Sequence, residues 1–330
     1  MMLRQVWSHP SFPAGVLAVL ALVFALSVNP GLLSTGSMIG WSTSQLGLWT
    51  AVLGQTLALM GRGIDLSVGA GVSLVNVAAI ALFEAGWPTA GVIVAMLILG
   101  LLIGAANGAL IGWLRLNPLL ATFATSFVLL GLTLQIRSAP GGSAPMAAVM
   151  FMNGATWGIP NAMLVFVLVL LLWGLVARSA FWLRLRATGA DPVRAWNSGL
   201  PTARIKVMSY VMAGFFTALS GLFVTFCVGA GDPLFAQPYT LLTIAGAVIG
   251  GVSLGGGTGS GYGAVLGAVF VGLTSDIALG IGVSPFWQQL IVGCVLLTGL
   301  AVVVRAGRWL KAKSDSTVTR SAFETKGKAA

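Results

Sequence analysis

Few side chains in this sequence have the type and spacing that catalysis or metal binding requires. The chain holds one histidine, His9, two cysteines and seven acidic residues. A serine nucleophile such as Ser260 needs a nearby base, and His9 lies before the first apolar segment, so a Ser–His dyad is excluded. One histidine and the separated Cys227 and Cys294 make no metal ligand set. We therefore expect no catalytic residue, no metal site and no enzymatic activity in this chain.

The glycine-rich segment 250–268, "GGVSLGGGTGSGYGAVLGA", is the part of the chain that most resembles a nucleotide-binding loop. It has no lysine, so it does not match G-x-x-x-x-G-K-[ST], and it does not satisfy G-x-G-x-x-G either. We expect its glycines to form a turn or to let two helices pack closely. The chain itself is therefore expected to bind no nucleotide cofactor.

The segment 61–71, "GRGIDLSVGAG", places Arg62 and Asp65 between two apolar stretches. Its glycines predict a break between two helices. Two interpretations of the charges remain open: Asp65 or Ser67 caps the helix that follows, or Arg62 and Asp65 form an ion pair at the break.

The elements that position these segments are apolar. The chain is 57% hydrophobic and 7% charged, against roughly 25% charged residues in a soluble domain. Stretches near the ~20 residues needed to cross a bilayer recur along the sequence, which indicates a membrane protein that crosses the bilayer many times. The ten predicted spans are 13–33, 46–60, 70–86, 90–112, 118–137, 161–178, 207–229, 239–254, 262–280 and 286–304.

The net charge of +10 follows the membrane topology. With a cytoplasmic N-terminus, ten spans place every basic residue except Arg137 on the cytoplasmic side, and the C-terminus with them. This asymmetry is the positive-inside rule, and it predicts attraction to anionic lipid. We expect no nucleic acid partner.

These observations predict an all-α, polytopic fold of about ten transmembrane helices. Residues 1–304 form one transmembrane domain with a cytoplasmic loop at 179–206, and the basic tail 305–330 is expected to be disordered and cytoplasmic. The second and eighth spans are short and flanked by glycine, as broken or re-entrant helices are. Pro118 and Pro285 open the last spans of two four-span blocks, as an inverted repeat would require.

Within the cytoplasmic loop, "DPVRAWNSG" (191–199) predicts a complete short helix. Asp191 suits its N-cap, Pro192 its first position and Gly199 its C-terminal stop. The helix is too short to be stable alone. From the pattern, Trp196 and Arg194 are equally consistent with a helix lying on the membrane surface and with a docking site for a cytosolic partner.

The chain has no evident means of supplying its own energy. An ion-coupled carrier needs ionisable groups at mid-membrane, and only Asp276 lies clearly inside a predicted span, near its outer end. Spans without a nucleotide site or a proton relay indicate a pore whose energy comes from another subunit.

Five segments resemble one known family. They are "GRGIDLSVGAGVSL" (61–74), "NGALIGWLRLNPLLATFAT" (107–125), "TGADPVRAWNSGLPTARIKV" (188–207), "GGVSLGGGTGSGYGAVLGA" (250–268) and "GVSPFWQQLIVG" (282–293). In this order, over about residues 40–304, they resemble the permeases of ATP-binding-cassette importers for monosaccharides, which include the ribose, xylose, galactose and autoinducer-2 permeases. The chain departs from the family pattern at Arg62, where a glycine is usual, at Trp196, where a small or basic residue is usual, and at Ala124.

The resemblance implies a multi-pass subunit of a bacterial inner membrane that moves a sugar. Its partners would be a cytosolic ATPase pair, which uses ATP and Mg, a periplasmic sugar-binding protein, and a second copy of itself or a similar permease. Most of the specificity is expected to lie in the binding protein. The resemblance also implies that the 188–200 loop couples to the ATPase, through Gly189, Asp191, Pro192, Arg194, Ala195, Trp196, Ser198 and Gly199.

The translocation path of such a protein is expected to be lined by small, amide and hydroxyl side chains. The candidates are Gln55, Asp65, Ser67, Asn107, Thr122, Thr125, Trp287 and Gln288. Each is equally suited to a helix cap or an interhelical hydrogen bond. The alternatives for the whole chain are a secondary sugar carrier that works without ATP, the branched-chain amino-acid or nucleoside branch of the same permeases, and a structural scaffold.

Overall fold

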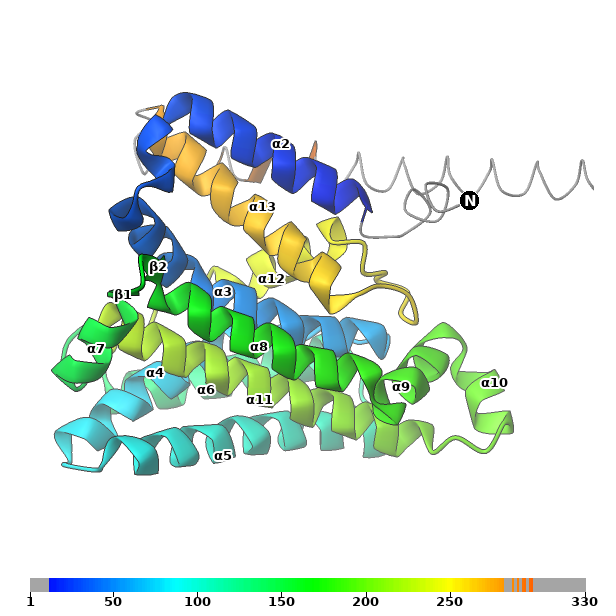
Figure 1. Ribbon diagram of the computed structural model, residues 1–330. Helices are drawn as coiled ribbons and strands as arrows, with labels where there is room; N and C mark the ends of the chain where they lie inside the picture. The colour runs from blue at the N-terminus through cyan, green and yellow to red at the C-terminus, as the bar shows by residue number, and fades with distance from the viewer. Residues whose placement is uncertain (1–11, 282–286, 288–289, 291–292, 295–296, 299–330) are drawn as a thin grey trace, which may run out of the picture.

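The computed structural model describes residues 12–281 and, beyond them, 287, 290, 293–294 and 297–298 (Figure 1). The predicted tail 305–330 and the sites at Pro285 and Gln288 lie outside the described residues, as does most of the tenth predicted span.

The regular elements of the described part are helices and one small hairpin, joined by loops. The strands β1 (Ala155–Thr156) and β2 (Ile159–Pro160) pair antiparallel, with Ala155 opposite Pro160. The helices are α2 (Phe12–Val28), η1 (Pro30–Leu33), α3 (Thr35–Met60), α4 (Val68–Glu84), α5 (Thr89–Gly108), the π-helical η2 (Ala109–Trp113), α6 (Pro118–Ile136), α7 (Met146–Met152), α8 (Asn161–Arg178), α9 (Ala180–Ala190), α10 (Pro192–Asn197), α11 (Thr202–Val228), α12 (Tyr239–Ile249) and α13 (Gly261–Gly280).

The all-α prediction is confirmed for the described residues. By length and composition, Thr89–Trp113, Pro118–Ile136, Asn161–Arg178 and Thr202–Val228 are long and apolar enough to cross a membrane. Shorter apolar helices cover four further predicted spans, at Phe12–Val28, Val68–Glu84, Tyr239–Ile249 and Gly261–Ile277.

The start of the second predicted span is wrong. Helix α3 begins at Thr35 rather than at residue 46. The hydroxyl of Ser34 accepts the N–H of Ser37 and so caps the helix. The early turns are rich in serine, threonine and glycine, which hides them from a hydropathy pattern. Ser42 and Thr43 satisfy their hydroxyls by donating to the carbonyl of Ile39 on the same helix.

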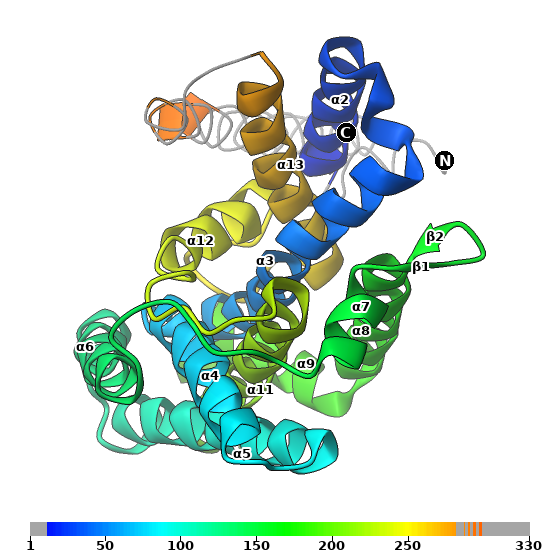
Figure 2. The same ribbon diagram turned by 90° about the vertical axis from the view of Figure 1, so that its left-hand side faces the viewer.

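The centre of the molecule is the pair α3 and α11, and the helices around it repeat their packing. Helices α4 and α5 pack against α11, whereas α12 and α13 pack against α3. Figure 2 shows α5 and α13 on opposite sides of this central pair. The helices therefore form corresponding pairs: α3 corresponds to α11, α4 to α12 and α5 to α13. In each half, the second and third helices pack against the first helix of the other half. An inverted repeat predicts such a correspondence.

Small residues set the closest helix contacts. Gly100 and Gly104 of α5 face Gly214 of α11, and none of the three has room for a Cβ, because backbone atoms of the facing helix occupy that position. Such contacts let two helices approach closely and gain dispersion energy that larger side chains would prevent. They hold α5 against the central pair.

Candidate functional site

The break between α3 and α4 is organised by Asp65. Its Oδ1 accepts the backbone N–H of Ser67 at 2.9 Å and the Ser67 hydroxyl at 2.6 Å. Asp65 therefore holds the residue that precedes α4, while the Ser67 side chain makes no capping bond to the helix. The capping interpretation is therefore wrong for both residues, because Asp65 bonds to Ser67, which precedes α4, and accepts no N–H of the helix itself.

The predicted Arg62–Asp65 ion pair is also wrong. Arg62 has a left-handed backbone conformation, with φ of 62°, and its side chain extends to α9 instead. There Nε donates to the carbonyl of Gly189 and Nη2 to the carbonyl of Ala190, both at 2.6 Å. The last carbonyls of a helix have no partner within the helix and carry partial negative charge, so they attract a cation. Asp65 is already engaged by Ser67.

Side chains of three further helices bond to residues 66–69, at the start of α4. Asn107 of α5 donates from Nδ2 to the Ser67 hydroxyl at 2.8 Å. Thr122 of α6 accepts the N–H of Leu66 at 3.0 Å, and Thr240 of α12 accepts the N–H of Gly69 at 3.2 Å. These bonds join side chains far apart in sequence into one polar cluster around the start of α4. We call Asp65, Ser67, Asn107, Thr122 and Thr240 the polar core.

The structure brings four of the predicted path residues together in this polar core. Asp65 is 4% exposed and Ser67 2%, while Asn107 and Thr122 are fully buried. Asp65, Ser67 and Asn107 bond to one another, and Thr122 bonds to backbone groups, which lowers the cost of burying them. Oδ1 of Asn107 has no hydrogen-bond partner among the described residues. In this conformation they are packed inside the bundle.

The remaining path candidates lie apart from one another. Gln55 is fully buried in α3, and neither atom of its amide has a hydrogen-bond partner among the described residues. Thr125 donates to the carbonyl of Ala121 on its own helix. Trp287 is 56% exposed, and Gln288 lies outside the described residues.

Two residues of this region were missed by sequence reasoning. Tyr210 of α11 is 2% exposed, and its hydroxyl, which has no partner among the described residues, lies against Gly63 and leaves no room for a Cβ there. Thr240 was missed as well, because it lies in an apolar helix. The sequence feature that could have indicated Tyr210 was Gly63, because only a glycine leaves room for the tyrosine hydroxyl at that position.

A separate set of contacts joins the end of α3, the end of α9 and the loop before α13. Gly257 donates its backbone N–H to the carbonyl of Met60, at the end of α3, at 3.1 Å. Gly189 packs so tightly on the same Met60 carbonyl that a Cβ would collide with it. Gly256 and Gly257 both have positive φ, which favours glycine. We call Met60, Arg62, Gly189, Ala190 and Gly257 the junction.

The short helix predicted at 191–199 is confirmed. Asp191 Oδ1 accepts the N–H groups of Val193 and Arg194, each at 3.0 Å, and Pro192 occupies the first turn. Gly199 has φ of 81°, and the N–H of Leu200 returns to the carbonyl of Ala195 at 3.0 Å. This is a Schellman stop.

The charge on Asp191 is stabilised by the N–H groups that its carboxylate caps. The N–H of Arg194, foremost among several causes, lowers the pKa of the Asp191 carboxyl. The Arg194 guanidinium adds an ion pair at 3.0 Å, which is largely exposed and so contributes little to stability.

Helix α10 presents an apolar face away from the bundle. Val193 is 68% exposed and Trp196 64%, and at a spacing of three residues both lie on one side of the helix. Ala195 is buried on the other side. Figure 1 shows α10 projecting at the end of the molecule, beside α9 and opposite the β1–β2 hairpin. Within the part of the chain that the structure describes, this face is exposed and can contact a surface outside the chain.

Known proteins resemble the chain over most of its length. Residues 37–300 match the family model described as "Branched-chain amino acid transport system / permease component". The autoinducer 2 import system permease protein LsrC of Salmonella choleraesuis (strain SC-B67) is 31% identical over 304 residues, which is 88% of this chain and 85% of that protein.

Two further relatives extend this comparison. The corresponding LsrC protein of Escherichia coli (strain K12 / DH10B) is 31% identical over 306 residues, covering 89% of this chain and 86% of the relative. The ribose import permease protein RbsC of Bacillus subtilis (strain 168) is 33% identical over 248 residues, covering 74% and 77%. No solved structure gives a significant match.

Proposed function

The chain belongs to the family of branched-chain amino acid transport system permease components, and on that basis we propose that it is the membrane subunit of an ATP-binding-cassette importer for a monosaccharide or a similar small sugar or polyol. The relatives named above import ribose and autoinducer 2 by their printed names, which favours the sugar branch over the amino-acid branch. In this proposal ATP hydrolysis belongs to a separate cytosolic ATPase, which binds ATP and Mg.

The observation that carries the proposal is the projection of α10. Its Val193 and Trp196 form an exposed apolar pair on a helix that is capped at both ends. Aromatic side chains beside arginine are typical of the residues that dominate binding energy at protein interfaces. We assign α10, with its flanking Gly189, Ser198 and Gly199, as the segment that docks on the ATPase.

A continuous set of contacts leads from α10 to the polar core. Helix α10 follows directly on α9, whose last carbonyls accept the Arg62 side chain. Arg62 lies three residues before Asp65, which holds the start of α4. A displacement of α10 by the ATPase would therefore move the helix break and, with it, Asn107 and Thr122. The differential contact of ATP with its own subunits would supply the energy of this shift.

The same proposal assigns the remaining partners and the orientation. The α10 end of the molecule faces the cytosol with both termini, in agreement with the concentration of Arg and Lys there. The opposite end receives the sugar from a periplasmic binding protein. A second copy of this chain, or a related permease, completes the pore in the bacterial inner membrane.

Reconstitution tests the proposal. The permease, its ATPase and its binding protein are placed in proteoliposomes, and uptake of radiolabelled ribose and of radiolabelled leucine is measured with and without ATP. We expect ATP-dependent uptake of the sugar. Uptake that persists without any ATPase would establish a secondary carrier, and ATP-dependent uptake of leucine alone would place the chain in the amino-acid branch.

A further inference from the structure

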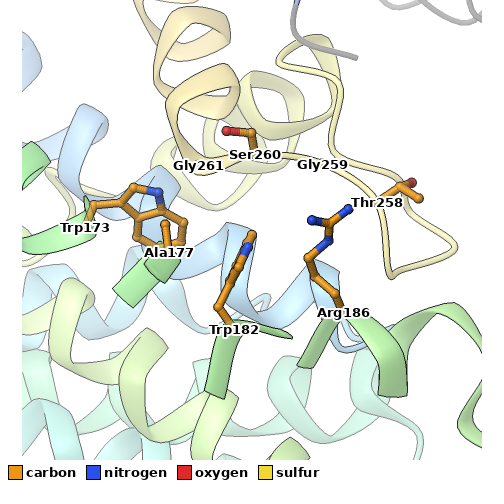
Figure 3. Close-up of a pocket in the computed structure, with 8 residues that line it drawn as sticks. All are labelled: Trp173, Ala177, Trp182, Arg186, Thr258, Gly259, Ser260 and Gly261. Carbon is orange, nitrogen blue, oxygen red and sulfur yellow. The ribbon is translucent and has the colours of Figure 1, made fainter. Parts of the chain in front are cut away.

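A cavity lies at the α10 end of the molecule, outside the polar core and the junction. It is enclosed by the end of α8, by α9 and by the loop that leads into α13 (Figure 3). The residues lining it are Trp173, Ala177, Trp182, Arg186, Thr258, Gly259, Ser260 and Gly261. No acidic side chain is among them.

The cavity is lined by hydrogen-bond donors that have no acceptor. Trp173 is fully buried, and its Nε1 has no hydrogen-bond partner among the described residues. The backbone N–H groups of Gly259, Ser260 and Gly261 likewise donate to no described atom. The last belongs to the first turn of α13, where a helix has unsatisfied N–H groups and a partial positive charge. These donors together are suited to an anion.

Gly261 is essential to this geometry. A Cβ at this position would fall on the indole of Trp173, next to Nε1. Figure 3 shows the nitrogen-bearing edge of Trp173 turned toward Gly261, and the guanidinium of Arg186 turned toward the Thr258–Gly259 segment. Arg186 makes one long bond of 3.5 Å to the carbonyl of Gly257. Most of its five N–H donors remain available to a ligand.

The surroundings indicate what kind of anion fits. Arg178 follows the lining residue Ala177 and adds positive charge at the end of α8. The exposed side chains Leu168, Leu171 and Leu175, between 63% and 68% exposed, lie on the face of α8 opposite to Trp173 and Ala177. This apolar stripe is suited to contact with acyl chains, so the cavity lies at the end of a helix whose other face is suited to lipid.

We propose that this cavity binds a phosphate group, carried either by an anionic phospholipid or by a free phosphate ion. Arg186 supplies the charge, and Trp173 Nε1 and the N–H groups of the 259–261 segment supply directed hydrogen bonds. The two sources share this chemistry, and the test below separates them. The site is independent of the transport function proposed above.

Thermal unfolding of the full-length permease in detergent tests the site. A ligand that binds the folded state raises the unfolding temperature. We expect phosphatidylglycerol to raise it more than phosphatidylcholine does, since only the former carries a net negative charge. Inorganic phosphate is titrated alone and in competition. Stabilisation by phosphate but not by phosphatidylglycerol would assign the cavity to the free ion, whereas equal stabilisation by both lipids and none by phosphate would overturn the proposal.

Two variants and one control make the test specific. Arg186→Gln removes an exposed charge and should weaken the apparent affinity for phosphatidylglycerol about tenfold, the effect of one charge-assisted hydrogen bond. Trp173→Phe keeps the ring and removes the N–H, and should weaken the affinity severalfold. Arg184→Gln, on the same helix but outside the cavity lining, should leave it unchanged. Equal losses in Arg184→Gln and Arg186→Gln would mean a diffuse surface charge effect and no site.

Discussion

Arg62 Nε donates to the carbonyl oxygen of Gly189 at 2.6 Å, across 127 residues of sequence. This bond connects the break after α3 to the last two residues of α9, which are followed by Asp191, the N-cap of α10. Arg62 reaches that position from a left-handed backbone conformation, which costs a residue other than glycine roughly 1–2 kcal/mol. Two charge-assisted bonds offset this cost. The bonds need a long cationic side chain, whereas the backbone conformation favours glycine.

Substitutions at Arg62 should separate these two effects. Arg62→Gly loses both bonds and relieves the strain, whereas Arg62→Ala loses the bonds and keeps the strain. We expect Arg62→Ala to be less stable than Arg62→Gly by about 1 kcal/mol in thermal unfolding. Both should lower the amount of sugar transported per ATP hydrolysed. Full transport per ATP in Arg62→Gly would show that Arg62 plays no part in coupling.

Trp196 gives the most direct test of the docking face. It is 64% exposed, so Trp196→Ala should leave the unfolding temperature unchanged. Association with the ATPase should weaken by about 2 kcal/mol, the cost typical of an interface hot spot. Trp157→Ala is the matched control, because Trp157 is 93% exposed in the hairpin at the opposite end. If Trp196→Ala leaves ATPase binding intact but weakens association with liposomes, α10 lies on the membrane surface instead.

The Asp191 cap should make α10 sensitive to acid. Its pKa is lowered from the ordinary value of 3.8 by the N–H of Arg194. A carboxyl with a lowered pKa in the folded state stabilises that state above its ordinary pKa, and the contribution is lost as the pH falls through the lowered value. Amide hydrogen exchange in α10 should therefore rise, after correction for intrinsic rates, as the pH drops below about 4.

Asp191→Asn provides the control for this prediction. The amide can still accept the N–H groups of Val193 and Arg194, and it does not titrate in this range. Its exchange in α10 should not change over the same pH interval beyond the intrinsic rates. An identical acid response in both proteins would assign the effect to another group.

Local signals predicted much of the fold, because they act over a few residues. Asp191, Pro192 and Gly199 are adjacent to the helix that they delimit, and each occupies the predicted position. The hydropathy pattern likewise predicted most of the spans. The start of α3 was not predicted, since a polar helical end that satisfies its own hydroxyls has no hydropathy signal.

Non-local partners could not be predicted in the same way. The sequence places Arg62 and Asp65 three residues apart, where an ion pair is the simplest expectation. The structure instead brings the end of α9 next to Arg62 and satisfies Asp65 with Ser67. Similarly, the glycines of 250–268 match no phosphate-binding motif. The N–H donors around Gly261 line a cavity only because Trp173 of α8 and Arg186 of α9 pack beside them.

Asp65 should act through hydrogen bonding rather than through charge. Asp65→Asn keeps an oxygen that can accept from the backbone and hydroxyl of Ser67, whereas Asp65→Ala leaves both donors unsatisfied in a buried site. We expect Asp65→Ala to lower the free energy of unfolding by about 1–3 kcal/mol, and Asp65→Asn to lower it much less. Chemical denaturation in detergent measures both. If the two substitutions are equally harmful, the negative charge itself is required.

Gly189 should tolerate no side chain, because its Cα packs on the carbonyl of Met60. In Gly189→Ala the added methyl would force α9 away from α3 and lengthen the bonds from Arg62, at a cost of about 1–3 kcal/mol for overpacking. Gly36→Ala, in the first turn of α3, is the matched control, since no atom of the described residues lies within 4 Å of the position its Cβ would take. That substitution should be neutral or stabilise the helix by up to about 1 kcal/mol. Transport per ATP should fall in Gly189→Ala and stay unchanged in Gly36→Ala, because only the former separates α10 from the helix break. Wild-type stability and coupling in Gly189→Ala would show that the junction adapts to the methyl and that its close packing is not needed for coupling.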